Sequence, residues 1–170
     1  MLLTSNLVVV GAVAALGGTS AIVDLYTRRV PNPLTFGTAL LGVALAAFHA
    51  TPVGVAGAFG GLAVGLALML PGHVIGATGA GDVKLFAALG TFLGPARIGI
   101  AFIYVALVGG VIAVVIARRR QSLGVTLGRT AAILRTGGAA ADDIERPSAN
   151  NRFAYAPAIA LGAIAAALGL

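Results

Sequence analysis

The chain has 170 residues, of which 59% are hydrophobic and only 9% are charged, with a formal net charge of +6 and a mean hydropathy of +1.03. Soluble globular domains carry about 25% charged residues, so the composition excludes that class and predicts a membrane protein. Because there is no cysteine, disulfides and zinc sites of the Cys-x-x-Cys type are excluded. The two histidines, His49 and His73, fall in different segments, and we predict neither a metal site nor a cofactor.

Apolar runs predict six transmembrane helices in one bundle, because about 20 residues cross a hydrocarbon core of roughly 30 Å. The fourth run is too short to cross unaided, since a helix rises only about 1.5 Å per residue. The chain is expected to turn after it at Gly94-Pro95, the best breaker available. Residues 1–170 are therefore predicted to form a single all-α, polytopic membrane domain. The six runs are Leu7–Val23, Leu34–Ala50, Val53–Leu70, Val83–Leu93, Ile98–Ala117 and Phe153–Leu170.

The distribution of basic residues predicts how the bundle is oriented. Met1–Asn6 carries no basic residue, so the first run looks like a retained span and not like a signal peptide. With the N-terminus outside, Arg97 is the only one of the 11 lysines and arginines on the outer side, which fits the positive-inside tendency. The same bias accounts for the net charge, so we expect membrane lipid as a partner and no nucleic acid. The predicted inner residues are Arg28, Arg29, Lys84, Arg118, Arg119, Arg120, Arg129, Arg135, Arg146 and Arg152.

Two further stretches inform the architecture. Gly57, Gly61 and Gly65 lie four apart in the third run, and small residues at this spacing favour close helix packing without catalytic meaning. The only extended polar segment, residues 118–152, lies between the fifth and sixth runs. Its first half mixes arginines with leucines at helical spacing and is expected to lie on the inner membrane surface. Its second half, Gly137–Asn151, is typical of a solvated loop.

Only two acidic residues lie outside this loop, Asp24 and Asp82. Asp24 ends the first predicted span and Asp82 begins the fourth, so both are expected at the inner face of the membrane, where they can meet. An acid inside or at the edge of a bilayer is a candidate functional group. Structural interpretations stay open for each, namely a pair of Asp24 with Arg28 at i,i+4 spacing, and an N-cap role for Asp82.

Two neighbouring carboxyl groups suit peptide hydrolysis without a metal, a cysteine or a Ser-His pair. One carboxylate activates a water while a second, protonated carboxyl polarises the scissile carbonyl. In a site of low dielectric the two acids cannot both ionise and therefore share one proton. Gly79 and Gly81 next to Asp82 are expected to permit unusual backbone angles and to let a substrate strand approach the carboxyl. Asp24 and Asp82 are accordingly the predicted catalytic pair.

The residues around these aspartates carry a resemblance to a known family. The stretches are Asp24-Leu25-Tyr26-Thr27-Arg28-Arg29-Val30-Pro31-Asn32 and Gly79-Ala80-Gly81-Asp82-Val83-Lys84-Leu85. Together they resemble the GxGD prepilin peptidases, membrane aspartic proteases that process type IV prepilins. Tyr155-Ala156-Pro157-Ala158-Ile159 is similar to the short members associated with tight-adherence (Flp-type) pili. The resemblance implies an aspartic endopeptidase acting on a prepilin or pseudopilin leader, with its active site facing the cytoplasm from the inner membrane.

Departures from the wider family refine this expectation. Larger prepilin peptidases have a long cytosolic loop with paired cysteines and also methylate the new N-terminus. Here the first inner loop is only Asp24–Pro33 and the chain lacks cysteine, which implies cleavage without methylation. The signal-peptide-peptidase and presenilin group usually pairs its GxGD motif with Tyr-Asp, whereas Val23 precedes Asp24 here. That difference argues against this second group.

Several other residues near the two motifs receive predicted roles. Pro31 and Asn32 are expected to shape the site together with the two glycines, because Pro31 and Pro33 fix the turn that presents Asp24. Lys84 and Arg28 are possible accessory groups, although anchoring at the lipid surface is the favoured explanation for them. His73 lies on the active side of the predicted bundle and is given no role.

Two other classes of function stay open at this point. In a transporter or proton-relay protein, Asp24 and Asp82 would carry ions, and in a scaffold of a secretion machine they would be structural. The Gly-x-Gly before Asp82 discriminates among these readings, because ion relay gives no clear need for it.

Overall fold

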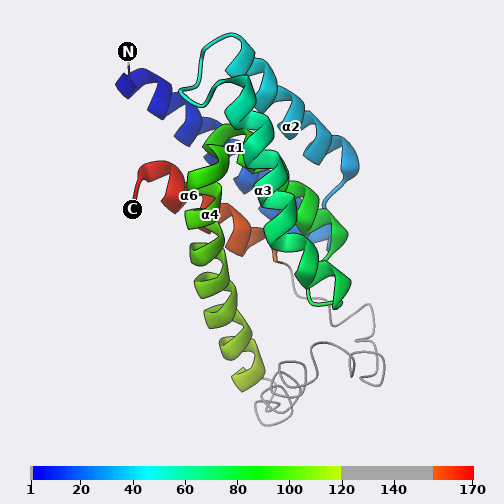
Figure 1. Cartoon of the computed structure of the whole chain (residues 1–170). Helices are drawn as coiled ribbons and strands as arrows, with labels where there is room; N and C mark the ends of the chain where they lie inside the picture. Colours follow the sequence, from blue (N-terminus) through cyan, green and yellow to red (C-terminus); the bar gives the residue numbers. More distant parts are fainter. Residues whose placement is uncertain (1, 120–154) are drawn as a thin grey trace.

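The computed structural model of the protein describes residues 2–119 and 155–170, which form helices joined by short loops, with no β-strand in these two ranges (Figure 1). The predicted all-α, polytopic membrane bundle is confirmed, while the number of spans stays a prediction. Residues 120–152 of the predicted inner loop lie outside the described residues, whereas Arg118 and Arg119 end the fourth helix. The helices are α1 (Leu2–Thr27), α2 (Asn32–Ala47), α3 (Gly54–Val74), α4 (Ala80–Arg119) and α6 (Ala156–Leu168).

α4 is broken at Gly94, where the backbone is non-helical (φ 73°, ψ 175°). The aromatic rings of Phe86 and Phe102 lie on either side of this break, with their centroids only 6.2 Å apart. In a continuous helix, 16 residues would separate them by about 24 Å, so the chain folds back at Gly94. The turn predicted at Gly94-Pro95 is therefore confirmed, and α4 consists of a first segment (residues 80–93) and a second segment (residues 95–119).

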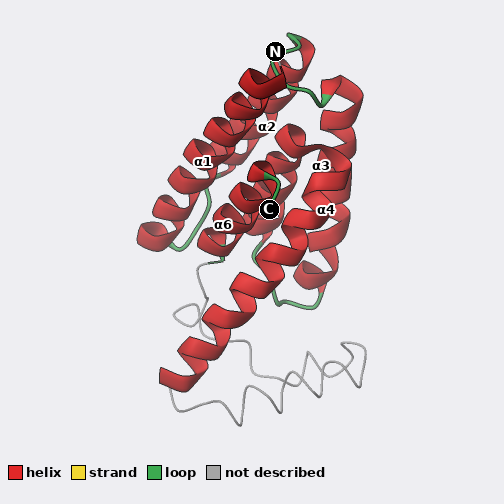
Figure 2. Cartoon of the chain, turned by 90° about the vertical axis from the view of Figure 1, so that its left-hand side faces the viewer, coloured by secondary structure: helices red, strands yellow, loops and turns green. Residues whose placement is uncertain are grey.

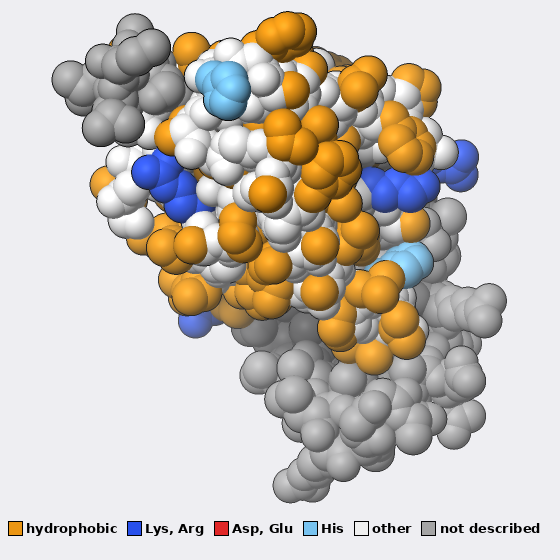
Figure 3. Space-filling view, turned by 45° about the horizontal axis from the view of Figure 1, so that its top comes forward, with side chains coloured by type: hydrophobic (Ala, Val, Ile, Leu, Met, Phe, Trp, Pro, Cys, Tyr) orange, Lys and Arg blue, Asp and Glu red, His pale blue; other side chains and the backbone are white. Residues whose placement is uncertain are grey.

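Within residues 2–119 and 155–170, three stretches are long and apolar enough to cross a membrane, namely Asn6–Thr27, Gly54–Val74 and Ala80–Val115. The last of these contains the fold-back at Gly94 and is not one straight span. Large side chains such as Leu40, Ile103 and Leu107 are exposed on the outside of the bundle. Figure 3 shows hydrophobic side chains over much of one face, with no acidic side chain visible among the described residues. The protein is thus an integral membrane protein whose apolar surface faces lipid.

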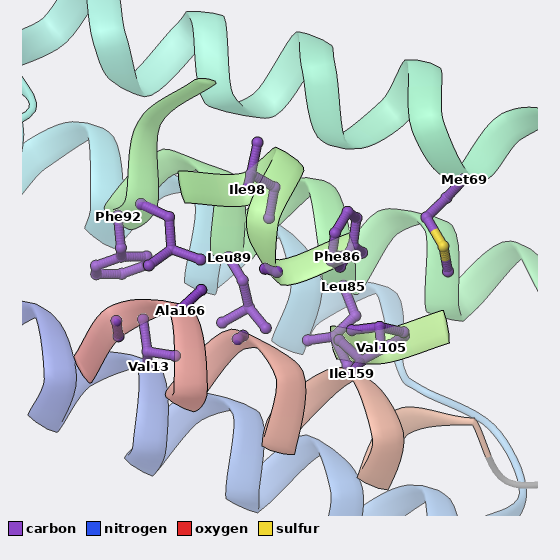
Figure 4. Close-up of a cluster of buried hydrophobic side chains, with 14 of the residues drawn as sticks. Val13, Met69, Leu85, Phe86, Leu89, Phe92, Ile98, Val105, Ile159 and Ala166 are labelled. Atoms are coloured by element: carbon purple, nitrogen blue, oxygen red, sulfur yellow. The ribbon is translucent and has the colours of Figure 1, made fainter. Parts of the chain in front are cut away.

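The first segment of α4 lies inside the bundle, whose helices pack side by side in Figure 2. Its residues from Leu85 to Leu93 are all buried, although this stretch was expected to be too short to cross the membrane unaided. α3 and α6 both pack against α4, and α6 also packs against α1. Figure 4 shows part of this core, in which side chains of α1, α3 and α6 pack around those of α4. Neighbouring helices therefore surround the short segment on all sides and keep it away from lipid.

Glycines bring α3 and the first segment of α4 into backbone contact. A Cβ added at Gly61 would run into the carbonyl oxygen of Gly90, and one at Gly65 would lie 2.9 Å from Cα of Ala87. No side chain fits between these two helices at either point. The predicted close packing is confirmed at Gly61 and Gly65, and it fixes the height of the Asp82 end of α4 relative to α3.

The helix boundaries differ from the predicted runs at several ends. α1 extends to Thr27 and so includes Asp24. α2 begins at Asn32, since Pro31 occupies the N-cap position (φ −65°) and Pro33 fits the first turn. It ends at Ala47 and not at Ala50, because His49 takes a left-handed backbone (φ 55°). α6 begins at Ala156, and residues 153 and 154 of the sixth predicted run lie outside the described part.

Candidate active site

Asp24 lies in the last turn of α1 and is almost completely buried, with 5% of its surface exposed. The helix ends three residues later because Arg28 adopts a left-handed conformation (φ 52°), a common way to terminate a helix. The backbone N–H of Ala156, at the start of α6, donates a hydrogen bond to Asp24 Oδ2 at 3.4 Å. The carboxylate is therefore positioned by its own helix end and by the first residue of α6.

Asp82 lies in the first turn of α4 and is also buried, with 8% of its surface exposed. The carbonyl of Gly79 accepts the backbone N–H groups of Asp82 (3.1 Å) and Val83 (3.2 Å), which makes Gly79 the residue that caps the helix. The backbone of Gly79 in turn hydrogen-bonds the Asp82 carboxylate. The interpretation of Asp82 as an N-cap is therefore wrong. Its side chain lies within the first turn, where the helix dipole stabilises a negative charge.

The two aspartates line one cavity of about 780 Å³ at one end of the bundle. They are close enough for the charge of Asp24 to act on Asp82. The expected meeting of the two acids is thus observed, although they are 58 positions apart in the numbering. The walls come from the end of α1 and its following loop, from the stretch between the last turn of α3 and the first turn of α4, and from the residue before α6. The other lining residues are Arg28, Arg29, Val30, His73, Gly76, Ala77, Thr78, Gly79, Ala80, Gly81 and Tyr155.

The two glycines before Asp82 act through close contacts. Neither has a positive φ, since this conformation is found at Gly76 and Gly94 but not at Gly79 or Gly81. The expectation that they permit unusual backbone angles is therefore wrong. A Cβ at Gly79 would lie 3.0 Å from Asp82 Oδ2, and one at Gly81 would lie 3.2 Å from Cβ of Val30. Gly79 leaves room for the carboxylate, and Gly81 lets the α1–α2 loop pack against the start of α4.

The other predicted site residues connect the two motifs. Lys84 Nζ donates a hydrogen bond to Asn32 Oδ1 at 3.0 Å, which ties the start of α4 to the start of α2. Pro31 accepts the backbone N–H groups of Leu34 and Thr35 through its carbonyl and so begins α2. Arg28 lines the cavity. The sequence alone did not indicate the Asn32–Lys84 contact, because lipid anchoring was the favoured explanation of Lys84.

Several cavity residues were not predicted as part of the site, and two of them, Tyr155 and His73, have side chains suited to acid–base chemistry. Tyr155 was noted only in a motif of the last helix, yet it lines the cavity and its phenol is acted on by the charge of Asp82. A hydroxyl-bearing residue at the inner end of an apolar span is the sequence signal that could have indicated Tyr155 as a site residue. His73 also lines the cavity, and its Nδ1 lies 3.0 Å from the carbonyl oxygen of Thr78. Because a carbonyl only accepts, Nδ1 carries the proton in this contact.

The donor groups of the site suit acid–base chemistry. Among residues 2–119 and 155–170, no group of three or more His, Cys, Asp or Glu side chains could hold a metal ion. The cavity instead offers two buried carboxyl groups, a phenol and a run of backbone around Gly79. Paired carboxyls in such surroundings can exchange a proton with a bound water. The fold and the site together define an integral membrane protein with two buried carboxyl groups in a cavity at one end of its helix bundle.

Comparison with known families identifies the class more closely. Residues 7–114 match the type IV leader peptidase family, a region that covers more than half of the chain and includes both Asp24 and Asp82. The chain belongs to this family, and its activity is that of a peptidase on the leader of type IV prepilins. No curated protein and no solved structure matches the chain significantly.

Proposed function

We propose that this protein is an aspartic endopeptidase that cleaves the leader of Flp-like prepilins or pseudopilins at the cytoplasmic face of the inner membrane. Asp24 and Asp82 are its catalytic pair, and Gly79, Gly81, Pro31 and Asn32 shape the site. The single observation that carries this proposal is the presence of both buried carboxyl groups in one cavity. Membership of the type IV leader peptidase family supplies the substrate class.

The proposed hydrolysis needs one carboxylate and one carboxylic acid. The carboxylate takes a proton from a water, whose oxygen adds to the scissile carbonyl carbon. The carboxylic acid gives its proton to the carbonyl oxygen, which carries partial negative charge until this transfer is complete, and a neutral tetrahedral diol forms. When the diol collapses, the C–N bond breaks and the new amine takes up the proton from the first carboxyl. One hydroxyl of the diol gives its proton back to the second carboxylate as the new C=O bond forms. Both residues are required in every turnover, since each changes protonation state.

The basic residues support a cytoplasmic position for the cavity. Arg28 and Arg29 line it and Lys84 is exposed beside it. Arg97 follows the fold-back at Gly94. By helix rise, the fold-back lies about 18 Å from Val83, at the end of this segment away from Asp82. The described basic residues are therefore concentrated at the aspartate end, as the positive-inside tendency requires of a cytoplasmic face. We place the N-terminus outside on the same basis.

The substrate is proposed to be cut without methylation of the new N-terminus. The connection between α1 and α2 spans only residues 28–31, which is too little chain for a separate methyl-donor site, given that ligand sites usually occupy some 300 Å³ or more. The similarity of Tyr155-Ala156-Pro157 to short, single-function enzymes supports the Flp-like substrate. Such a substrate would present its cleavage site at the membrane surface, next to its hydrophobic helix.

Co-expression with a Flp-type prepilin, in a host without its own prepilin peptidase, tests this function. The wild-type protein should convert the prepilin to a faster-migrating form, whereas Asp24→Asn and Asp82→Asn should leave it uncut while still inserting into the membrane. Asp142→Asn, in the segment expected to be a solvated loop, is the matched control and should process normally. Mass spectrometry of the mature pilin should find an unmodified N-terminus.

Three results would contradict parts of this proposal. Full processing by either Asn variant would remove that residue from the catalytic pair. Loss of processing in Asp142→Asn alone would show that the wrong acid had been chosen. A mature N-terminus heavier by one methyl group would show a second activity in the chain.

A further inference from the structure

Tyr155, in the C-terminal part of the described chain, lines the wall of the cavity. It precedes α6 and is partly buried, with a helical backbone (φ −91°, ψ −19°). Its side chain lines the cavity with Asp24 and Asp82, and the charge of Asp82 acts on its phenol. The next residue, Ala156, donates its backbone N–H to Asp24 Oδ2. Two consecutive residues thus contact or face both acids, one through the main chain and one through the side chain.

The ring of Tyr155 is held against α4 at a glycine. A Cβ added at Gly109 would lie 2.7 Å from Cε2 of Tyr155 and 2.8 Å from its hydroxyl oxygen. Gly109 is buried, whereas a Cβ on the adjacent Gly110 would meet no atom within 4 Å. The second segment of α4 therefore has a recess that fits the phenol and fixes the position of its hydroxyl.

A tyrosine hydroxyl can supply what two carboxyl groups lack. An ionised carboxylate only accepts hydrogen bonds, and a shared proton provides one donor at a time. A phenol has an unperturbed pKa near 10, so it is a neutral O–H donor at physiological pH. Donors placed where negative charge develops on a carbonyl oxygen stabilise the transition state of acyl transfer, and tyrosine is one of the side chains that do so.

We propose that Tyr155 is a third catalytic residue, whose phenol O–H donates a hydrogen bond to the oxygen of the scissile carbonyl as the water adds. This inference rests on the proposed peptidase function. The phenol keeps its proton throughout, so the proton transfers remain those of the two aspartates. Gly109 is a positioning residue in this scheme, because it leaves the recess that seats the ring against α4.

Kinetics of purified enzyme in lipid vesicles, with a prepilin substrate, test the inference. Tyr155→Phe keeps the ring and removes only the hydroxyl, so kcat should fall about 100-fold, the usual loss for one oxyanion donor. KM, the shape of the pH profile and the thermal unfolding temperature should stay close to those of the wild type. Gly109→Ala should lower kcat by displacing the hydroxyl, but should cause no further loss when combined with Tyr155→Phe. Gly110→Ala and Tyr26→Phe, whose side chain is exposed, are the matched controls and should behave as wild type.

The outcomes separate this inference from the proposed function. A wild-type kcat in Tyr155→Phe, with Asp82→Asn inactive, would overturn the role of Tyr155 and leave the aspartate pair intact. A raised KM with unchanged kcat would make the phenol a ground-state contact and would also overturn it. A displaced pH profile would show that the phenol acts by tuning Asp82 and not by contacting substrate. Activity in Asp82→Asn would instead contradict the proposed function.

Discussion

Glycines at the two ends of the first segment of α4 lie in different surroundings. Near the fold-back, Gly61 and Gly90 bring two backbones together so closely that no side chain fits between them. Near Asp82, Gly79 and Gly81 border a cavity of about 780 Å³ on one side and the Val30 loop on the other. Near the fold-back the glycines allow two helices to pack closely, whereas near Asp82 they leave room for a carboxyl group.

This contrast explains how an apolar bundle tolerates two buried acids. The α3–α4 contact makes the central segment rigid, because protein interiors are close-packed and resist small displacements. The aspartate end can then hold its cavity open without collapsing around it. Non-helical backbone at this end, from Gly76 to Gly79, lines the cavity, as is required of irregular backbone at membrane depth.

The largest expected effect is the loss of stability caused by a side chain at the close contact between α3 and α4. Gly61→Val should place its side chain against the carbonyl of Gly90 and destabilise the protein by at least about 3 kcal/mol, the upper end of overpacking costs. Thermal unfolding in detergent, together with the amount of protein in the membrane, measures this loss. Gly11→Ala, where an added Cβ meets no atom within 4 Å, is the control. Equal stability of Gly61→Val and wild type would show that the two helices can separate freely.

A smaller, more selective effect is expected at Gly81. Gly81→Ala places a Cβ 3.2 Å from Cβ of Val30, so the α1–α2 loop must move by a fraction of an ångström. Small misplacements in an active site can cost up to about 100-fold in rate, and we expect kcat/KM to fall at least tenfold with little change in unfolding temperature. Gly18→Ala, another position with open space, serves as the control. An unchanged rate would mean that the loop does not set the position of the carboxyl groups.

The smallest effect is expected for the hydrogen bond between Lys84 and Asn32. This contact is exposed, so Lys84→Met should lower kcat/KM by only about two- to fivefold, in keeping with the modest net value of a single hydrogen bond. Asn32→Ala should have a similar effect, and the double variant should be no worse than either single one. Independent, multiplying losses would show that the two residues act separately, for example by lipid contact.

The sequence was sufficient to predict the helical bundle, the break at Gly94 and the meeting of Asp24 with Asp82. Long apolar runs, a Gly-Pro pair and rare intramembrane acids are each strong local signals. The exact helix ends were less predictable, since they depend on residues such as His49 that adopt a left-handed backbone. The contacts of Tyr155 and Lys84 could not be predicted, because they join segments far apart in the sequence and depend on how the helices pack.

The reason for the Gly-x-Gly pattern was also beyond the sequence. A glycine before an aspartate can serve to permit unusual backbone angles or to permit the close approach of a neighbour. Only the packed structure distinguishes these two explanations. Here the neighbours are the Asp82 carboxylate for Gly79 and Val30 for Gly81. Val30 comes from the α1–α2 loop, so its approach depends on tertiary structure.

A double-mutant cycle on the two aspartates tests most directly whether they act as one catalytic unit. The measurement is kcat/KM for prepilin cleavage by wild type, Asp24→Asn, Asp82→Asn and the double variant in lipid vesicles. Residues that act as a unit give non-additive losses, so each single variant should lose at least about 1,000-fold in kcat/KM and the double variant should lose no more than either. Retention of kcat/KM within about tenfold by either single variant, or losses that multiply in the double variant, would contradict a shared role of Asp24 and Asp82.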